Sequence, residues 1–122
     1  MVEASAPWIG IDLGTTNSAV AIWRNGTIEI IPIMDGGRTL SSIVAYKEDV
    51  NEVLVGHSAK NQLFRNLKNT IYDAKRMVGK KVDDKSIIEL QKFWNFEIVE
   101  GRLGKPKVKI TVNGVDKELS PE

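Results

Sequence analysis

Residues 10–17 read GIDLGTTN, in which a carboxylate, a glycine and two hydroxyls follow one another at the end of an apolar run. Main-chain N–H groups in a tight turn can point together and bind an anion such as phosphate. Gly14 would let a phosphate approach the backbone closely, and the hydroxyls of Thr15 and Thr16 would donate to its oxygens. With Asn17 closing the turn, the stretch is a candidate phosphate-binding loop.

Asp12, two residues before this turn, is the candidate metal ligand. Its carboxylate would repel a phosphate unless a cation lay between them. Mg²⁺ suits that place because it keeps several of its waters and usually meets a protein through one or two carboxylates. The alternative is a plain hairpin turn in which Asp12 accepts hydrogen bonds from local amides, and the residues alone leave the two open. The standard phosphate-binding patterns, G-x-x-x-x-G-K-[ST] and G-x-G-x-x-G, do not match this stretch.

Lys75 is the second residue whose place suggests chemistry. On a helical wheel of residues 71–78 it falls in the arc that Ile71, Ala74 and Val78 occupy. An ammonium on an inward face is costly unless it is paired or lines a polar cleft, which makes Lys75 a candidate for contact with a charged ligand. The residues alone favour the alternative, in which the side chain reaches past its apolar neighbours to solvent.

The composition excludes several other kinds of site. The 122 residues include no cysteine and one histidine, His57, which rules out disulfides and cysteine-bound metals and argues against a histidine-based zinc site or catalytic triad. Lys and Arg number 17 against 16 Asp and Glu, a net charge of +1, so neither a nucleic acid nor a membrane surface is an expected partner. The N-terminus lacks the features of a secretory signal, and no apolar run could span a membrane. A reducing, soluble compartment is expected.

The N-terminal third reads as an antiparallel meander that would carry the candidate loop. Apolar strands are predicted over 8–13, 18–23 and 27–33, and Asn25-Gly26 predicts the hairpin turn between the last two. Because 8–13 is apolar at nearly every position, we expect it inside a sheet covered on both faces.

The rest of the chain reads as short strands and helices after a loop over 34–42. Strands are predicted over 43–47, 52–56, 96–100, 106–112 and 115–119, and helices over 57–66 with Ser58 as cap, within 69–81 ending at Gly79, and within 83–93 capped by Asp83 or Asp84. Alternate residues of 106–112 are apolar, which predicts one buried and one wet face. Ser120-Pro121-Glu122 has the features of a helix start, which suggests that the chain was cut there.

Four stretches resemble one known family. GIDLGTTNSAV (10–20), GHSAKNQ (56–62), NTIYDAKRMVGKK (69–81) and GKPKVKITVNG (104–114) are similar, in order and spacing, to the start of the heat shock protein 70 (DnaK-type) chaperones. The resemblance runs from about residue 8 to residue 122 and implies an α/β fold of the actin-like ATPase type. The chain would be the first part of lobe I of a two-lobed nucleotide-binding domain, with α+β content in this fragment.

The resemblance divides the chain into four segments. Residues 1–7 would be a disordered tail, 8–42 the first strands of the lobe I base with the phosphate loop, 43–119 the smaller lobe I subdomain, and 120–122 the start of a truncated helix. Two departures, GRTLSS without the usual proline at 37–42 and Trp94-Asn95-Phe96 where the family has Trp-Pro-Phe, indicate a divergent member.

The resemblance also implies roles for the candidate residues. In that family the loop matching Gly14, Thr15, Thr16 and Asn17 holds the β- and γ-phosphates of ATP or ADP. The aspartate matching Asp12 meets Mg²⁺ through water. The lysine matching Lys75 reaches the γ-phosphate and helps to place the attacking water, so Asp12 and Lys75 are the implied catalytic residues. Hydrolysis would then rest on positioning and charge stabilisation.

The implied function is that of an ATP-dependent molecular chaperone of the stress response, cytoplasmic, which hydrolyses ATP to control binding of unfolded polypeptides. J-domain co-chaperones and nucleotide-exchange factors would be its partners. The alternatives are another actin-like ATPase or sugar kinase, and a chaperone-like scaffold without hydrolysis. Because the family's other phosphate, carboxylate and adenosine contacts come later in its chains, the 122 residues alone are predicted to be inactive. They are also predicted to self-associate through 8–32, or to leave that meander disordered.

Overall fold

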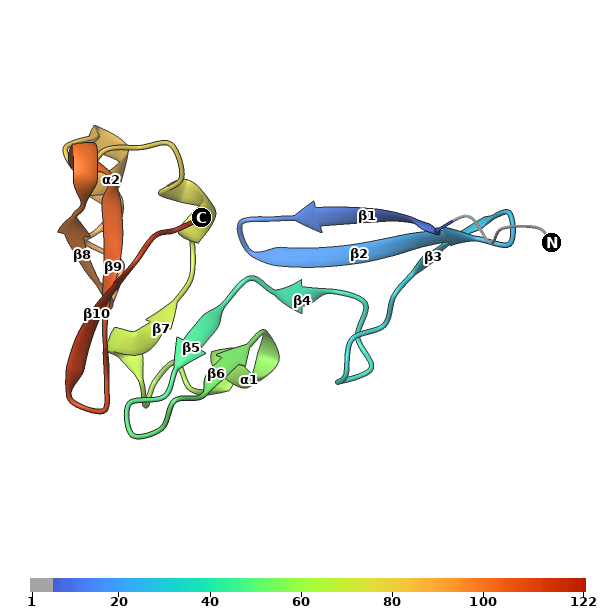
Figure 1. Ribbon diagram of the computed structural model, residues 1–122, viewed down its shortest axis with the longest axis horizontal. Coiled ribbons are helices and arrows are strands. Elements are labelled where there is room, and N and C mark those ends of the chain that lie inside the picture. The colour runs from blue at the N-terminus through green and yellow to red at the C-terminus, as the bar shows by residue number, and fades with distance from the viewer. Residues whose placement is uncertain (1–5) are drawn as a thin grey trace.

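A computed structural model describes residues 6–122 (Figure 1). The tail predicted over 1–7 therefore lies mostly outside the described residues; Ala6 and Pro7 precede the first strand without regular secondary structure. The described chain forms three antiparallel sheets with short helices between their strands. None of the helices in this part of the chain is long and apolar enough to cross a membrane.

The first sheet confirms the predicted meander. Its three main strands are neighbours in chain order: β1 (Trp8–Leu13), β2 (Asn17–Arg24) and β3 (Thr27–Ile30). Asn25 and Gly26 both have positive φ between β2 and β3, as a two-residue Asn-Gly hairpin requires. The short strand β4 (Leu40–Ser41) pairs with the start of β2. β3 is shorter than predicted, and Pro32, which has no N–H, follows two residues after its end.

Every residue of β1 is exposed, although both faces of the meander carry apolar side chains. Because side chains alternate along a strand, Ile9 and Ile11 lie on one face and Trp8 on the other. Trp8 is 81% exposed and Ile11 is 70% exposed. Figure 1 shows β1 and β2 extending as a ribbon away from the two other sheets. The prediction of a strand covered on both faces is therefore wrong for this chain, because the apolar pattern indicates what a strand can bury and not whether a covering element is present.

The second sheet, in the order β6-β5-β7, contains β5 (Val44–Tyr46), β6 (Val53–Val55) and β7 (Thr70–Ile71). Helix α1 (His57–Asn61) follows β6 and is shorter than the predicted 57–66. After Asn61 the main-chain N–H groups of Gln62 and Leu63 donate to carbonyls three residues earlier, as from Leu63 to Lys60 at 3.1 Å. This is the 3₁₀ pattern, so the α-helix ends here. Its cap is Gly56 rather than Ser58, with positive φ and no side-chain hydrogen bond.

The helix predicted within 69–81 is absent. A three-residue 3₁₀ turn, η1 (Leu67–Asn69), leads into β7, and a second one, η2 (Ala74–Arg76), follows it. Asp73 has φ +57°, in the left-handed region, so it cannot continue a right-handed helix from either side. Pairing of Thr70 and Ile71 with β5 also takes the first residues of the predicted helix into the sheet. The helical-wheel argument for Lys75 consequently does not hold.

The third sheet, in the order β10-β9-β8, contains β8 (Glu97–Glu100), β9 (Pro106–Val112) and β10 (Val115–Leu119). A 3₁₀ turn, η3 (Arg102–Gly104), joins β8 to β9, and helix α2 (Lys85–Leu90) precedes the sheet. As predicted, alternate residues of β9 are buried. Asp84 caps α2 by position, but its carboxylate accepts from the Lys81 N–H at 3.3 Å and not from the helix. Residues 120–122 form no helix.

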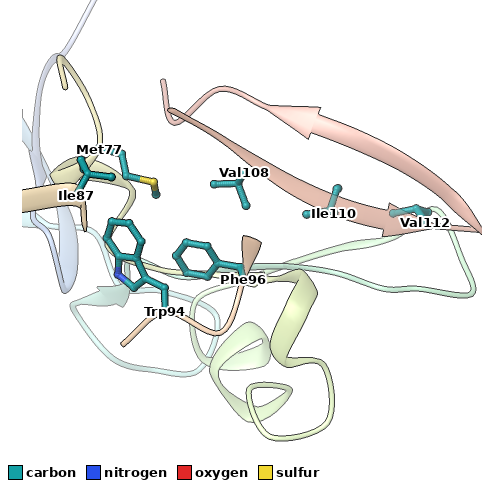
Figure 2. Close-up of a cluster of buried hydrophobic side chains, with 7 residues drawn as sticks. All are labelled: Met77, Ile87, Trp94, Phe96, Val108, Ile110 and Val112. Carbon is teal, nitrogen blue, oxygen red and sulfur yellow. The ribbon is translucent and has the colours of Figure 1, made fainter. Parts of the chain in front are cut away.

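One apolar cluster lies between this sheet and the segments before it (Figure 2). Trp94 and Phe96 stack with ring centroids 5.4 Å apart, and Tyr72 meets Phe96 edge-on at 5.2 Å. The buried side chains of the cluster are Met77, Ile87, Trp94, Phe96, Val108, Ile110 and Val112. The buried members of this cluster therefore all come after residue 70, and the cluster supports the segment that carries Lys75.

An ion pair on the solvent-exposed face of this sheet predicts a small dependence of the fold's stability on pH. The Thr111 hydroxyl donates to Asp116 at 2.7 Å and Lys109 lies 3.4 Å from the same carboxylate. The hydroxyl first, and then the ammonium, lower the pKa of Asp116 from its ordinary value of 3.8. A lowered pKa stabilises the fold fully above the ordinary value, and this stabilisation disappears as the pH falls through the lower folded pKa.

Asp116→Asn is therefore expected to reduce the loss of stability as the pH falls below about 4, by a small amount because the pair is exposed. Urea unfolding at a series of pH values measures it. Asp49→Asn is the matched control, since the Asp49 carboxylate makes no ion pair among the described residues. If Asp116→Asn loses stability at acidic pH as much as the unsubstituted chain does, Asp116 is not a cause of that loss.

Candidate functional site

The predicted phosphate loop joins β1 to β2 as a tight turn. Leu13 pairs with Ser18, which leaves Gly14 to Asn17 to reverse the chain. A Cβ built on Gly14 would overlap the main-chain oxygen of Asn17, so the turn can close only around a glycine. Gly14 does not have positive φ; its requirement is space, and the same lack of a side chain leaves the backbone open to a ligand.

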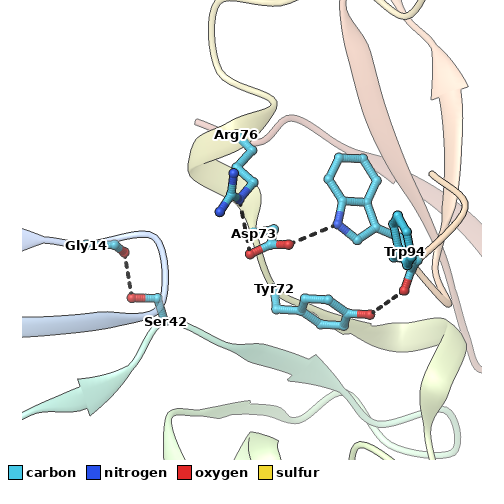
Figure 3. A network of polar contacts seen from close by, with 7 residues as sticks. Gly14, Ser42, Tyr72, Asp73, Arg76 and Trp94 are labelled. Atoms are coloured by element: carbon cyan, nitrogen blue, oxygen red, sulfur yellow. Dashed lines mark hydrogen bonds and ion pairs between the residues drawn. The ribbon is translucent and has the colours of Figure 1, made fainter. Parts of the chain in front are cut away.

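Ser42 fastens this loop to β4 (Figure 3). Its hydroxyl donates to the Gly14 carbonyl oxygen at 2.8 Å, and its main-chain N–H donates to the Thr16 carbonyl at 2.8 Å. The hydroxyls of Ser18 and Ser42 lie 2.8 Å apart. One residue, 28 positions from Gly14 in the chain, thus holds carbonyls on both sides of Thr15.

Lys75 reaches the base of the same loop. Its ammonium donates to the Leu13 carbonyl at 2.8 Å, across 62 residues of sequence. Lys75 is exposed and lies on η2, so it is not on the inward face of a helix as the wheel suggested. Its side chain nevertheless does not simply extend into solvent, because the ammonium is fixed next to Gly14. The structure therefore brings Lys75 and the loop together by a route that the sequence pattern did not indicate.

The turn that carries Lys75 is anchored to the core by Asp73. The Trp94 indole N–H donates to one carboxylate oxygen of Asp73 at 3.2 Å, and Arg76 lies 3.7 Å from the other. Tyr72 donates its hydroxyl to the Phe93 carbonyl at 3.1 Å, and Figure 3 shows these contacts beside the loop. Sequence reasoning missed Asp73, whose only signal is that aspartate adopts the left-handed region more readily than most residues.

Asp12 is exposed on β1, two residues before Gly14. Its position in the strand puts it on the face opposite to Leu13. No group of three or more acidic or histidine side chains gathers in the described part of the chain. A cation at this place would therefore meet one protein carboxylate and otherwise water, which is an arrangement that suits Mg²⁺ and not a closed protein cage.

A pocket of about 290 Å³ lies beside the loop, against β4. The loop contributes Thr15, Thr16 and Asn17 to its lining, and Lys60 is the cation that faces it. Ser42 and Asp73 also line this pocket, whereas Lys75 does not. Ser42 and Lys60 were both missed at the sequence level, because nothing in their local sequence shows that α1 and β4 lie against the loop.

The comparison with known proteins decides what this arrangement belongs to. The family model described as Hsp70 protein matches residues 8–122. The chain belongs to the Hsp70 family. Its mixture of antiparallel sheets and short helices agrees with a fragment of the family's α/β, actin-like ATPase fold.

Individual Hsp70 relatives match nearly the whole chain. It is 44% identical over 117 residues to the "Heat shock 70 kDa protein" of Trichophyton rubrum, covering 96% of the chain and 17% of the relative. It is 44% identical to the human "Putative heat shock 70 kDa protein 7", covering 93% of the chain and 30% of the relative. It is 45% identical to "Heat shock 70 kDa protein cognate 1" of Drosophila simulans, covering 86% of the chain and 48% of the relative. The chain thus spans less than half of the length of these Hsp70 relatives.

The loop of this Hsp70 chain fits a phosphate group on its own geometry. Among the described residues, no hydrogen bond uses the main-chain N–H of Gly14, Thr15 or Thr16. These three consecutive donors lie in a turn where the missing side chain of Gly14 leaves the backbone open. Unpaired N–H groups of this kind are the donors that bind anions in turns. The residues present therefore fit the phosphate part of a nucleotide.

Proposed function

We propose that this chain supplies the phosphate-binding part of an ATP-dependent molecular chaperone that hydrolyses ATP to control the binding of unfolded polypeptides. The observation that supports the proposal best is the three unpaired N–H groups of the 14–17 loop with the Lys75 ammonium fixed at the base of that loop. Membership of the Hsp70 family supports the ATPase activity and the chaperone role. In this proposal the cofactors are ATP or ADP with Mg²⁺.

The residues divide the work by their chemistry. The N–H groups of the loop and the hydroxyls of Thr15 and Thr16 bind the β- and γ-phosphates, and Asp12 holds a water of the magnesium ion. Lys75 gives up its bond to the Leu13 carbonyl and turns to the γ-phosphate, where its charge stabilises the group in transfer. The protein's part is to position the phosphates and to neutralise their negative charge, as phosphoryl transfer requires.

The partners proposed for the whole protein follow from the family. They are unfolded polypeptide clients, J-domain co-chaperones and nucleotide-exchange factors, in the cytoplasm. Of the alternatives, another actin-like ATPase or sugar kinase does not agree with the Hsp70 match over residues 8–122. A scaffold that binds nucleotide without hydrolysis is the alternative that an experiment must separate.

A chimera tests the proposal. Residues 8–122 replace the aligned segment of the Trichophyton rubrum relative, whose own ATP hydrolysis is measured first as the reference. We expect the chimera to hydrolyse ATP at a rate within about tenfold of the reference, a loss of at most about 1.4 kcal/mol in the barrier. A folded chimera that binds ATP but does not hydrolyse it would favour the scaffold. A folded chimera that does not bind ATP would overturn the proposal.

The 122 residues alone are expected to hydrolyse no ATP and to bind Mg-ATP at millimolar concentration or more weakly. Micromolar binding requires about 8 kcal/mol, whereas the loop offers only phosphate contacts, which open water screens. Isothermal calorimetry with Mg-ATP measures the affinity, and release of inorganic phosphate measures turnover. A dissociation constant in the micromolar range would contradict this expectation.

A further inference from the structure

The carbonyl groups around the phosphate loop are held in fixed directions. The Lys75 ammonium donates a hydrogen bond to the carbonyl of Leu13. The Ser42 hydroxyl donates to the carbonyl of Gly14, and the Ser42 N–H donates to that of Thr16. Each distance is 2.8 Å. In a trans peptide the C=O of one residue and the N–H of the next point in opposite directions from the same plane. Holding the Gly14 carbonyl toward Ser42 therefore turns the Thr15 N–H to the opposite side.

Ser42 donates two of these three hydrogen bonds. Its hydroxyl and its N–H donate to two carbonyls of the same four-residue loop, and its hydroxyl is also hydrogen-bonded to the hydroxyl of Ser18 near the start of β2. The donors that the loop keeps free, at Gly14, Thr15 and Thr16, are those on which phosphate binding depends in the proposed function. A preorganised set of donors binds more tightly than one that must be ordered when the ligand arrives.

We propose that Ser42 is a positioning residue for the phosphate loop. It does not touch the phosphates; through the Gly14 carbonyl it fixes the peptide that carries the Thr15 N–H, and through the Thr16 carbonyl it fixes the end of the loop. The proposal rests on the proposed function for its consequence, ATP affinity, but its first step concerns the order of the loop and needs no nucleotide.

The neighbouring residue provides a matched control. Ser41 has the same side chain, lies in β4 and pairs through its backbone with Asn17, but its hydroxyl makes no hydrogen bond among the described residues. Ser42→Ala removes the hydroxyl bonds and keeps the main-chain bond to Thr16, so the strand pairing survives. Ser42→Thr returns a hydroxyl and is the conservative rescue.

The first readout is the motion of the Thr15 N–H vector in the nucleotide-free chimera, from nitrogen relaxation. We expect an order parameter of about 0.85 in the unsubstituted chimera, in Ser41→Ala and in Ser42→Thr, and a fall below about 0.6 in Ser42→Ala. Unchanged order parameters in Ser42→Ala would overturn the proposal whatever the chimera does with ATP. A fall in all variants, Ser41→Ala included, would also overturn it, because the effect would then be general loosening.

The second readout is the affinity of the chimera for Mg-ATP. Ser42→Ala should weaken it about tenfold, as the loss of one partly buried hydrogen bond can, with a smaller effect on kcat, and Ser42→Thr should restore it. A looser loop with ATP affinity unchanged within twofold would overturn the positioning role. If the unsubstituted chimera folds and binds no ATP, the proposed function fails, and the relaxation result still decides whether Ser42 orders the loop.

Discussion

Lys75→Ala in the chimera is expected to leave ATP affinity within a few-fold of the unsubstituted chimera and to slow single-turnover hydrolysis about 100- to 1,000-fold. The proposed contact of Lys75 is with the phosphoryl group in transfer, where a fixed positive charge stabilises the transition state more than the bound substrate. Before ATP binds, the same ammonium donates to the Leu13 carbonyl, so its removal costs one exposed hydrogen bond and little stability. Rapid mixing of excess chimera with radiolabelled ATP measures the rate.

Arg76→Ala is the matched control for this variant. Arg76 is the next residue on η2, is also cationic, and pairs with Asp73 at 3.7 Å rather than with the loop. It should change hydrolysis by less than about threefold, as expected for an exposed ion pair. If Lys75→Ala also hydrolyses ATP within threefold of the unsubstituted chimera, the catalytic role of Lys75 is wrong. If Lys75→Ala weakens ATP binding but hydrolyses the ATP that it binds at an unchanged rate, the role of Lys75 is only to hold the loop in place.

The 122-residue chain is expected to run larger than a monomer in light scattering at about 100 μM, through its first sheet. The outer edge of β1 pairs with no strand in the described chain. Large apolar side chains stand on both faces of that sheet, with Trp8 81% exposed on one face and Ile11 70% exposed on the other. Apolar surface removed from water contributes about 25 cal/mol per Å², so burying several such side chains against a second copy gives several kcal/mol. Free strand edges offer the pairing as well.

Ile11→Lys should shift the chain toward monomer, because it puts a charge on the exposed face and on the free strand. Phe64→Lys is the control: Phe64 is 89% exposed but lies in the turn after α1 and in none of the three sheets, and its change should leave the measured mass as it is. If the meander is disordered instead, amide exchange over 8–32 will be fast. A strictly monomeric chain whose residues 8–32 exchange as slowly as 96–119 would refute both outcomes.

The local patterns predicted most of the strands and the helix within 83–93, but they predicted the other two helices poorly. The Asn-Gly turn at Asn25-Gly26 has the positive φ values that its type requires, and alternate side chains of β9 are buried as the alternation indicated. Both signals are local, since a turn depends on two residues and a strand face on a period of two. The 57–66 and 69–81 segments have helical composition, yet their helices are short or absent.

The failed helices have a physical cause outside their own sequence. Thr70 and Ile71 pair with β5, and Asp73 is held in the left-handed region while its carboxylate accepts from Trp94, 21 residues away. Such contacts contribute more than the few tenths of a kcal/mol per residue by which helix propensities differ. No window along the chain contains both partners, so no pattern in one window could have indicated them.

The same division runs through the site. The residue types in GTTN are local, and they are enough to mark the stretch as a candidate loop, which the space that only Gly14 allows then supports. The direction in which the loop presents its N–H groups depends on Ser42, 28 residues away, and the place of Lys75 depends on a bond across 62 residues. Steric contacts between neighbouring residues determine that the chain turns here. The orientation of the N–H groups depends on hydrogen bonds that form only when segments far apart in the sequence pack together.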